Sequence, residues 1–495
     1  MHMLIGSGAE YPLSACITTE WAATKSRGRM MSAVFLMQPL GQLMAWVVGL
    51  SAITGLSHSF NFSSTTTHND DIGIDILWRI VVGVGAVPAA VAILFRWTIP
   101  ESGRYTYDVR QDGRTAIRDT RTVYDHTSLQ SSQEHELDDF IPGDTNAIEE
   151  QTAGDLSPRL TMQSSVPTAA FDGFGRSSIG SEPYELPTEE HSYNQFAWSE
   201  IHSYFIKEGN WRYLAGTSLA WFLLDFAFYG LGFNNPGTMA KLWTSHDKAN
   251  DGETYSWRMN SPYGDDATIH EVLLANGKEC ILTSIIASIC GSVLVIMLIN
   301  KFDRRKALVW SFLLLASALL VLAILFLCLF HTKAHDVLIV FYAIVQFGFA
   351  FGPNTLLFII PAEIFPTRYR CTCYGITAAM GKLGAVFVQV AFQTFDNNAI
   401  KDPNSEALGY LMFIFAGFMA IGAVVSWAWI PTVQEREDGK PHRLKTRTLE
   451  RLGAGRSCMA EGERVGFRAR RRAILGRVKQ KERSPPETVV EPDLS

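Results

Sequence analysis

Three side chains spaced four residues apart give one apolar stretch of this chain a distinct chemical character. The run Trp221-Phe-Leu-Leu-Asp225-Phe-Ala-Phe-Tyr229 holds one carboxylate among apolar and aromatic residues. Residues four apart lie along one stripe of a helix, so these three side chains can face a single cavity. An ionised carboxylate that faces lipid costs about 3 kcal/mol on insertion scales. We therefore predict that Asp225 faces the interior of the protein.

Lys382 is a cation that this carboxylate could meet. It lies in another apolar segment, and a lysine ammonium is a common partner of oxyanions in proteins. A purely structural ion pair between Asp225 and Lys382 is the alternative interpretation. Trp221 and Tyr229, each taken alone, could equally be packing residues.

Blocks of about twenty apolar residues indicate a membrane protein. Hydrophobic residues make up 47% of the 495 residues and charged residues only 19%, and a helix needs about 20 apolar residues to cross a bilayer. The sequence predicts an all-α polytopic membrane protein with nine spans, near residues 3–20, 28–53, 76–98, 211–234, 279–299, 307–331, 337–361, 374–394 and 407–431.

Basic residues alternate between the loops that connect these spans. Every second loop is rich in Lys and Arg, whereas residues 56–75 contain neither. The positive-inside rule therefore places residues 21–29, the central segment and the C-terminal tail in the cytoplasm, and Met1 outside. Asn61-Phe62-Ser63 matches the N-glycosylation pattern in a predicted external loop, although this pattern is also common by chance.

The composition divides the chain into four parts. Residues 99–195 are rich in Ser, Thr, Asp, Glu, Gly and Pro, and such a segment buries too little apolar surface to fold alone. We predict three spans in 1–98, a disordered cytoplasmic linker in 99–200, six spans in 201–432, and a cytoplasmic tail in 433–495. The lipid bilayer is the expected partner, and nothing in the sequence points to nucleic acid.

An internal repeat relates the two membrane regions. Glu20 precedes Arg27 by seven residues, and Glu363 precedes Arg370 by seven, each pair at the cytoplasmic end of a span. The same shift of 343 residues places Tyr11 on Asn354. Three-span repeats of this kind build many helical transporters.

No cofactor, metal or enzymatic chemistry is predicted. Cys371 and Cys373 form a Cys-x-Cys pair without the second pair that a zinc site needs, and the other cysteines are scattered. The sequence contains no Gly-rich phosphate loop and no arrangement of nucleophile and base.

Several motifs resemble one transporter family. They are Tyr11-Pro-Leu-Ser14, the Glu20 to Arg27-Gly28 pair, Pro100-Glu-Ser-Gly-Arg104, the segment Phe351 to Arg370, and Gly381-Lys-Leu-Gly-Ala385. They are similar to the phosphate:proton symporters of the major facilitator superfamily, above all the fungal high-affinity branch. The resemblance implies the fold of that superfamily, with three helices of the N-terminal half and six of the C-terminal half. Counterparts of the first three helices are missing.

The resemblance also implies a set of functional residues. Substrate would be held by Tyr11, Gln38, Trp221, Asp225, Tyr229, Asn354 and Lys382. Proton coupling would involve Asp225, which binds phosphate while protonated, and Glu10. Salt bridges that close the cytoplasmic side would come from Glu20, Arg27, Glu101, Arg104, Asp303, Arg304, Glu363 and Arg370. Taken alone, Gln38 and Asn354 are also typical of hydrogen bonds between helices.

Three functions fit these features. The leading one is a plasma-membrane symporter that takes up inorganic phosphate with protons by alternating access. Glu10, where the phosphate transporters usually have Asp, suggests a glycerophosphodiester or another organic anion as the alternative solute. The missing spans suggest a third possibility, a non-transporting sensor or an inactive fragment.

Overall fold

The computed structural model describes residues 2–57, 68–110, 112–128, 198–233, 269–329, 335–394, 407–437 and 440–455. The chain forms two compact units, one of residues 1–99 and 194–495, the other of residues 100–193. Each unit is described by itself. The predicted glycosylation residue Asn61 lies outside the described residues.

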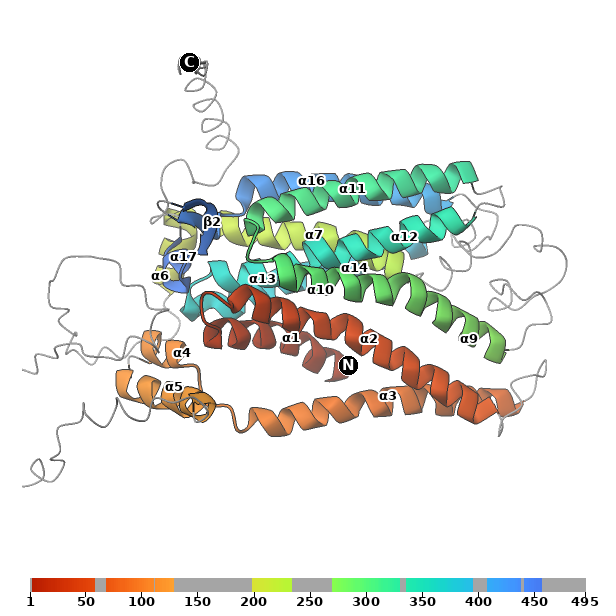
Figure 1. Ribbon diagram of the computed structural model, residues 1–495, viewed down its shortest axis with the longest axis horizontal. Coiled ribbons are helices and arrows are strands. Elements are labelled where there is room, and N and C mark those ends of the chain that lie inside the picture. Colours follow the sequence, from red (N-terminus) through yellow and green to blue (C-terminus); the bar gives the residue numbers. More distant parts are fainter. Residues whose placement is uncertain are drawn as a thin grey trace, which may run out of the picture. The chain divides into compact units, whose positions relative to one another are not determined.

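The larger unit is a bundle of long helices that run roughly parallel to one another (Figure 1). Among its described residues, eight helical segments are long and apolar enough to cross a membrane: Arg27–Leu56, Gly73–Arg96, Trp211–Gly232, Leu273–Leu298, Arg304–Leu329, Val337–Ile364, Thr367–Ala391 and Ala407–Trp429. The prediction of an all-α polytopic membrane protein is confirmed. The first predicted span forms a helix, α1, but is not among these eight, so the count of nine stays a prediction.

Three helices precede the central segment. They are α1 (His2–Trp21), α2 (Arg27–Ser57) and α3 (His68–Arg96). Each contains an internal proline, Pro12, Pro39 and Pro88, which membrane helices tolerate because neighbouring groups satisfy the freed carbonyl. α3 packs against α2, where Gly49 lies close to Val81.

Six further spans follow. They are α7 (Trp211–Phe233), α9 (Ile269–Cys280) with the π-turn η4 (Ile281–Ile285) and α10 (Ile286–Leu298), α11 (Arg304–Leu329), α12 (His335–Phe349) with the π-turn η5 (Ala350–Asn354) and α13 (Thr355–Ile364), α14 (Thr367–Thr394), and α16 (Ala407–Trp429). The tightest packing joins α7 to α14, α11 to α16 and α7 to α16. Fully buried Phe312, Phe326 and Phe415 fill this region.

The fifth span begins earlier than the sequence predicts. The predicted span covered residues 279–299, whereas α9, η4 and α10 continue as one helical segment from Ile269 to Leu298. The polar residues His270, Glu271 and Lys278 lowered the average hydropathy of α9 and concealed its start. Glu279 therefore lies well inside a helix, not at its edge.

A kink interrupts the segment from α12 to α13. Gly352 has non-helical dihedral angles (φ −113°, ψ −108°), and Pro353 follows it. Proline has no N–H to donate and its ring disturbs the preceding turn. The hydroxyl of Thr355 donates to the Ala350 carbonyl over 2.6 Å, which satisfies a backbone group near the kink.

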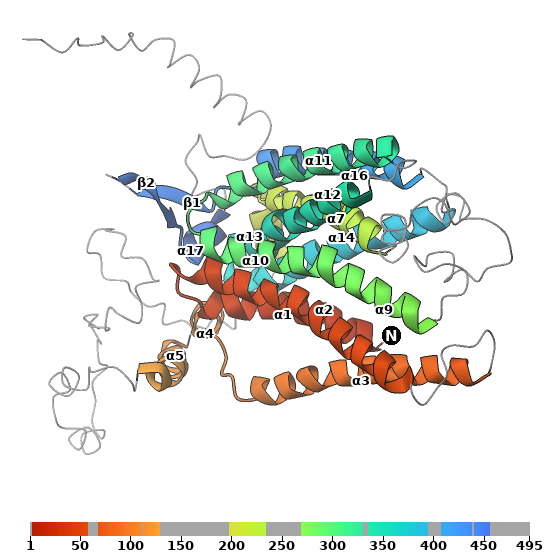
Figure 2. The same ribbon diagram turned by 45° about the vertical axis from the view of Figure 1, so that its right-hand side comes forward.

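The chain beyond α16 folds back into a small structured segment. β1 (Gln434–Glu437) and β2 (Lys440–Thr446) form an antiparallel hairpin with Gln434 opposite Thr446, and α17 (Leu449–Gly453) follows (Figure 2). α17 packs on α13 and α14, with Leu449 and Leu452 buried. Before α7 lie α6 (Trp198–His202) and the π-turn η2 (Ser203–Lys207).

The smaller unit contains two helices where the sequence predicted disorder. These are α4 (Gly103–Asp108) and α5 (Gly113–Ser128). The Ser102 hydroxyl accepts a hydrogen bond from the Tyr105 N–H at the start of α4, and Asp112 accepts one from the Thr115 N–H before α5. These two helices lie within the predicted linker of residues 99–200, whose disorder stays a prediction. Residues 129–197 lie outside the described part.

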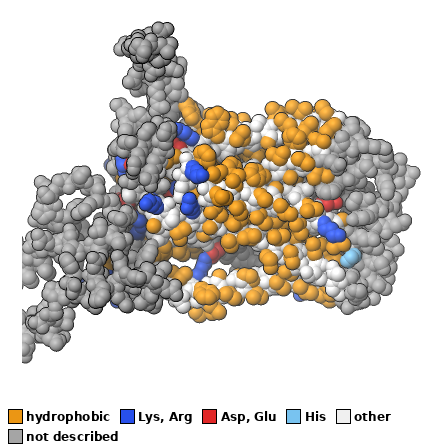
Figure 3. Space-filling view, in the orientation of Figure 1, with side chains coloured by type: hydrophobic (Ala, Val, Ile, Leu, Met, Phe, Trp, Pro, Cys, Tyr) orange, Lys and Arg blue, Asp and Glu red, His pale blue; other side chains and the backbone are white. Residues whose placement is uncertain are grey.

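Hydrophobic and basic side chains occupy different parts of the bundle surface. Figure 3 shows hydrophobic side chains as a broad belt over the middle of the helices, with Lys and Arg side chains gathered toward the left-hand end. Many large apolar residues of the described chain are exposed, such as Leu94, Phe95 and Met297. In a soluble protein such a surface would be a liability, whereas in lipid it is the expected outer face.

Candidate functional site

The stripe predicted on α7 exists and faces the bundle interior. Trp221 is 5% exposed and Asp225 3% exposed, while Tyr229, one turn further on, is half-buried. Trp221 also lies edge-on to the ring of Tyr374 on α14, with 5.7 Å between ring centroids. The expectation that Asp225 avoids lipid is met by this burial.

Lys382 of α14 joins this stripe. Its ammonium lies 3.2 Å from Asp225 Oδ2 and donates to the Tyr229 hydroxyl over 2.6 Å. The same nitrogen lies 4.4 Å from the centroid of the Tyr229 ring, within the range of a cation–π contact. The Lys382 side chain nevertheless remains 60% exposed. We call Trp221, Asp225, Tyr229 and Lys382 the central cluster.

Two glycines on α14 make this close approach possible. A Cβ on Gly381 would lie 2.5 Å from Trp221 Cδ1 and 2.9 Å from Asp225 Oδ2. A Cβ on Gly384 would collide with the backbone carbonyl oxygen of Phe222. Small residues at a helix interface allow the backbones of two membrane helices to approach closely. The Gly-Lys-Leu-Gly motif therefore holds Lys382 against α7.

Tyr11 connects α1 to the central cluster through aromatic contacts. Its ring lies 5.0 Å from Phe358 of α13, 5.9 Å from Trp221 and 6.4 Å from Tyr374, measured between centroids. Tyr11 is half-buried, and Phe358 and Tyr374 are fully buried. Sequence reasoning missed Phe358 and Tyr374, because aromatic residues are frequent in all the apolar segments.

Gln38 and Asn354 are not joined to this cluster by the contacts of the described residues. Gln38 is exposed on α2, and Asn354 lies at the end of η5, where α13 begins. Their predicted roles in binding substrate remain predictions.

Glu10 has an arginine partner that the sequence did not reveal. Both Glu10 carboxylate oxygens accept hydrogen bonds from the guanidinium of Arg96 at the end of α3. The Ser14 hydroxyl donates to Glu10 Oε1 over 2.6 Å. Glu10 thus connects α1 to α3, and its proposed part in proton coupling stays untested.

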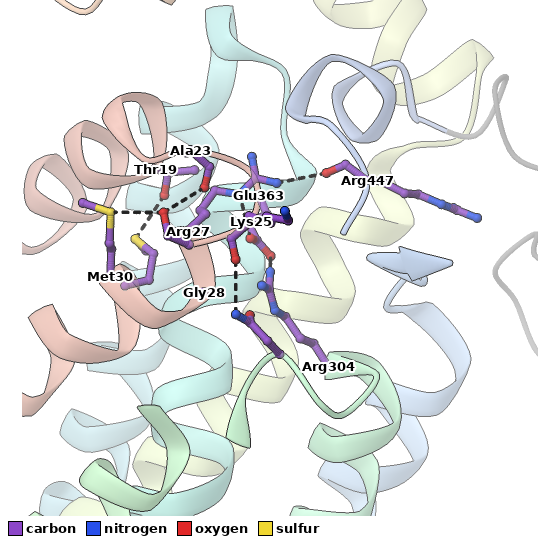
Figure 4. Close-up of polar contacts among 12 residues, drawn as sticks. Thr19, Ala23, Lys25, Arg27, Gly28, Met30, Arg304, Glu363 and Arg447 are labelled. Carbon is purple, nitrogen blue, oxygen red and sulfur yellow. Dashed lines mark hydrogen bonds and ion pairs between the residues drawn. The ribbon is translucent and has the colours of Figure 1, made fainter. Parts of the chain in front are cut away.

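A second cluster of charges lies at the helix ends and is fully buried. Arg27 Nε donates to Glu363 Oε1 over 2.9 Å, and the Arg304 guanidinium donates to Glu363 Oε2 (Figure 4). All three side chains are 0% exposed. Gly28 lies directly against the Arg304 guanidinium, where a Cβ would collide with it.

The repeated Glu–Arg pairs exchange partners between the two copies of the repeat. Arg27 of the first copy pairs with Glu363 of the second, and Arg370 of the second donates to Glu20 Oε1 of the first over 2.9 Å. Two equivalent bridges therefore tie the ends of α1 and α2 to α13 and α14. We call Glu20, Arg27, Arg304, Glu363 and Arg370 the helix-end network.

The segment after α16 reinforces this network. Arg27 Nη2 donates to the Arg447 carbonyl over 2.9 Å, and the Gln434 side chain accepts from the Arg304 backbone N–H over 3.1 Å. The Tyr204 hydroxyl donates to the Gly453 carbonyl over 3.0 Å. Burial raises the pKa of Tyr204, so it remains a neutral donor.

Three other predicted bridge residues have different roles. Glu101 pairs with Arg110 within the smaller unit, over 3.1 Å and largely exposed. Asp303 accepts hydrogen bonds from the backbone N–H groups of Arg305 and Lys306 and so caps the start of α11. Arg104 lies in α4. Glu101 and Arg104 belong to the smaller unit, so their predicted part in the cytoplasmic salt bridges stays a prediction.

No metal site is apparent in the described part of the chain, because no three His, Cys, Asp or Glu side chains come close enough there to share an ion. The central cluster instead combines one ammonium, one carboxyl, one hydroxyl and aromatic rings. Such a set can hold an oxyanion by charge and hydrogen bonds.

Comparison with known proteins defines the class. The profile of the family described as sugar (and other) transporter matches residues 3–150 and 269–437. The fold resembles the major facilitator proton:xylose symporter XylE bound to 6-bromo-6-deoxy-D-glucose, with a TM-score of 0.55, 16% identity, and coverage of 90% of this chain and 70% of that one. The chain belongs to this transporter family and has the major facilitator fold.

More similar relatives are named as phosphate carriers. The repressible high-affinity phosphate permease of Neurospora crassa is 31% identical over 85% of this chain, and the inorganic phosphate transporter PHO84 of Saccharomyces cerevisiae is 30% identical over 85%. The low affinity inorganic phosphate transporter 4 of Lotus japonicus is 27% identical over 85% of the chain and 66% of its own length. The chain spans only 63% and 62% of the two fungal proteins.

Proposed function

We propose that this chain binds inorganic phosphate at the central cluster and moves it with protons across the plasma membrane by alternating access. The position of Lys382, 3.2 Å from Asp225 and 2.6 Å from Tyr229 inside a membrane bundle, carries the proposal. The names of the fungal relatives support phosphate as the solute.

The exposure of Lys382 suggests how the anion enters. Its side chain is 60% exposed, whereas that of Asp225 is 4% exposed, so a ligand can reach the ammonium without disturbing the packing of the carboxyl. Phosphate would then replace the Asp225 carboxylate as the partner of Lys382. A protonated Asp225 can donate a hydrogen bond to phosphate, whereas an ionised one would repel it. Proton and anion would bind and leave together.

The helix-end network supplies the closed side of the alternating-access cycle. It ties α2 to α13 through Arg27 and Glu363, and α1 to α14 through Glu20 and Arg370. We place this end in the cytoplasm, with the N-terminus outside, because the basic loops of the sequence gather there. Opening toward the cytoplasm would require both bridges to break.

Purified protein in liposomes tests the proposal. We expect uptake of radiolabelled phosphate that increases with an inward proton gradient, and we expect Asp225→Asn to abolish the coupling to protons while the protein stays in the membrane. Asp75→Asn is the matched control, because it removes an exposed carboxylate, paired with Arg79, on α3.

Two results would contradict the proposal. Retained pH-dependent accumulation in Asp225→Asn would exclude the coupling role of that carboxyl. Competition by a glycerophosphodiester, with no competition by orthophosphate, would show that the cluster selects an organic phosphate ester instead.

A further inference from the structure

Glu279 of α9 is a buried acid in a membrane span, outside both charge clusters. It lies within the apolar segment Leu273–Leu298 and is 7% exposed. Ala275 and Thr283, four residues before and after it, are also buried, at 5% and 3% exposure. An ionisable residue at such a place is costly, and such residues usually have a function.

One carboxyl oxygen of Glu279 has no hydrogen-bond partner among the described residues. Oε2 is buried and receives no donor. The nearby Thr283 hydroxyl donates to the Glu279 backbone carbonyl over 2.7 Å, not to its carboxylate. A buried carboxylate oxygen that receives no donor makes the ionised form less favourable than the neutral carboxyl group. This geometry therefore favours Glu279 with a bound proton.

Among the described residues packed on α9 and η4, α12 and the part of α2 from residue 30 onward contain no Lys or Arg. α2 approaches α9 where Gly277 meets Trp46 and Leu50, and residues 30–57 of α2 contain no ionisable side chain. α12 packs on η4 and contributes Tyr342, whose hydroxyl accepts a hydrogen bond from Gln346 over 2.8 Å.

On α9 itself, the other ionisable residues whose side chains the structure describes are His270, Lys278 and Cys280. The side chain of Lys278, the residue before Glu279, is exposed, whereas that of Glu279 is buried.

Glu279 also lies beside a π-turn of its helix. The π-turn η4 begins two residues later and joins α9 to α10. A π-turn inserts an extra residue into the hydrogen-bond pattern and frequently occurs at functional sites. A change of this turn would rotate α9 relative to α10 and alter the burial of Glu279.

We propose that Glu279 is a second proton-binding carboxyl of the transport cycle, separate from Asp225. It holds a proton while the stripe of Ala275, Glu279 and Thr283 is buried, and releases it to water when a rearrangement at η4 exposes it. Its part in transport rests on the proton-coupled function proposed above, but its proton binding can be measured without transport.

Infrared difference spectroscopy of the purified chain in liposomes tests this inference, because the C=O stretch of a protonated carboxyl is separate from carboxylate bands. Raising the pH without phosphate should remove a carboxyl component from the wild-type spectrum. Glu279→Gln should lack this component, whereas Asp225→Asn should retain it. Lys278→Gln, an exposed neighbour on the same helix, is the matched control and should leave the spectrum unchanged.

The inference is wrong if the spectrum of Glu279→Gln superimposes on that of the wild type at every pH. If Glu279→Gln does not fold, Glu279→Asp tests the inference instead. A C=O band that titrates and belongs to residue 279 must shift in frequency in this variant, and an unshifted band would contradict the inference. In a transport assay, Glu279→Gln should change phosphate affinity less than about twofold while flattening the pH dependence of uptake. Absence of uptake by the wild type would contradict the proposed function but leave the spectroscopic result valid.

Discussion

The central cluster and the helix-end network both join acids to bases inside one bundle, but the protein holds them in different ways. Glu363 is shared by Arg27 and Arg304, and all three side chains are 0% exposed. Asp225 has Lys382 as its cationic partner, and that lysine is 60% exposed. One carboxylate is enclosed by bases, whereas the other pairs with a base whose side chain is largely exposed.

This difference indicates which cluster can exchange partners. Breaking a buried ion pair by removing one member leaves an uncompensated charge, so such pairs persist until the packing around them opens. A base that is accessible to solvent can transfer its hydrogen bonds to a ligand without that cost. The helix-end network is therefore suited to hold helices together, and the central cluster is suited to bind an anion.

The largest effect should come from Glu363→Gln. This change leaves the buried guanidinium groups of Arg27 and Arg304 without their carboxylate, which we expect to lower the free energy of unfolding by about 3–5 kcal/mol. Thermal and denaturant unfolding of the purified protein measures it. Glu200→Gln is the control, because its ion pair with Arg368 is partly exposed and should contribute less than about 1 kcal/mol. Equal losses would contradict the distinction between enclosed and accessible pairs.

Lys382→Met should weaken phosphate binding more than it lowers the stability of the fold. Loss of the ammonium removes charge-assisted hydrogen bonds of about 1.5–3 kcal/mol each, so we expect phosphate to bind at least about 10-fold more weakly. Stability should fall by less than for Glu363→Gln, because Asp225 can take up a proton when its partner is gone. Calorimetric titration with phosphate and unfolding of the same sample measure both quantities. Unchanged phosphate affinity would exclude Lys382 from the site.

Sequence patterns predicted the central cluster well, because two strong physical rules apply there. A stripe at spacing four and the cost of a charge in lipid together placed Trp221, Asp225 and Tyr229 inward. The glycines around Lys382 belong to a motif that the resemblance had singled out. Phe358 and Tyr374, whose rings contact Tyr11, lie in no spacing pattern or motif that would have singled them out.

Other features depended on three-dimensional packing. The repeat showed a Glu and an Arg seven residues apart in each copy, but not that Glu20 pairs with Arg370 and Arg27 with Glu363. Arg96 reaches Glu10 from a helix 86 residues away. Glu279 was overlooked because the polar residues of α9 shortened the predicted span.

Gly384→Ala should have an intermediate effect on the central cluster. Its Cβ would collide with the Phe222 carbonyl, and overpacking of this kind costs about 1–3 kcal/mol. Because α14 must move away from α7, Lys382 should also lose contact with Asp225 and phosphate affinity should fall. Gly375→Ala on the same helix is the control, since nothing lies within 4 Å of its Cβ position. If both variants bind phosphate alike, close packing of α7 and α14 does not position Lys382.

The smallest effects should come from two tyrosine-to-phenylalanine changes, one in the central cluster and one at the contact between η2 and α17. Tyr229→Phe removes the hydrogen bond to Lys382 but keeps the ring beside the ammonium, so phosphate should bind about fivefold more weakly, as expected for about 1 kcal/mol. Tyr204→Phe removes the bond to the Gly453 carbonyl and should lower stability by about 0.5–1.5 kcal/mol.

Each tyrosine variant serves as the control for the other. Tyr204 lies outside the central cluster, so its loss should leave phosphate affinity unchanged, whereas Tyr229→Phe should change affinity more than stability. Calorimetric titration and thermal unfolding of both proteins give the four values needed. If Tyr204→Phe weakened phosphate binding as much as Tyr229→Phe, the two regions would be energetically coupled in the resting protein. The exposed base at Lys382 would then depend on the same packing that encloses Glu363.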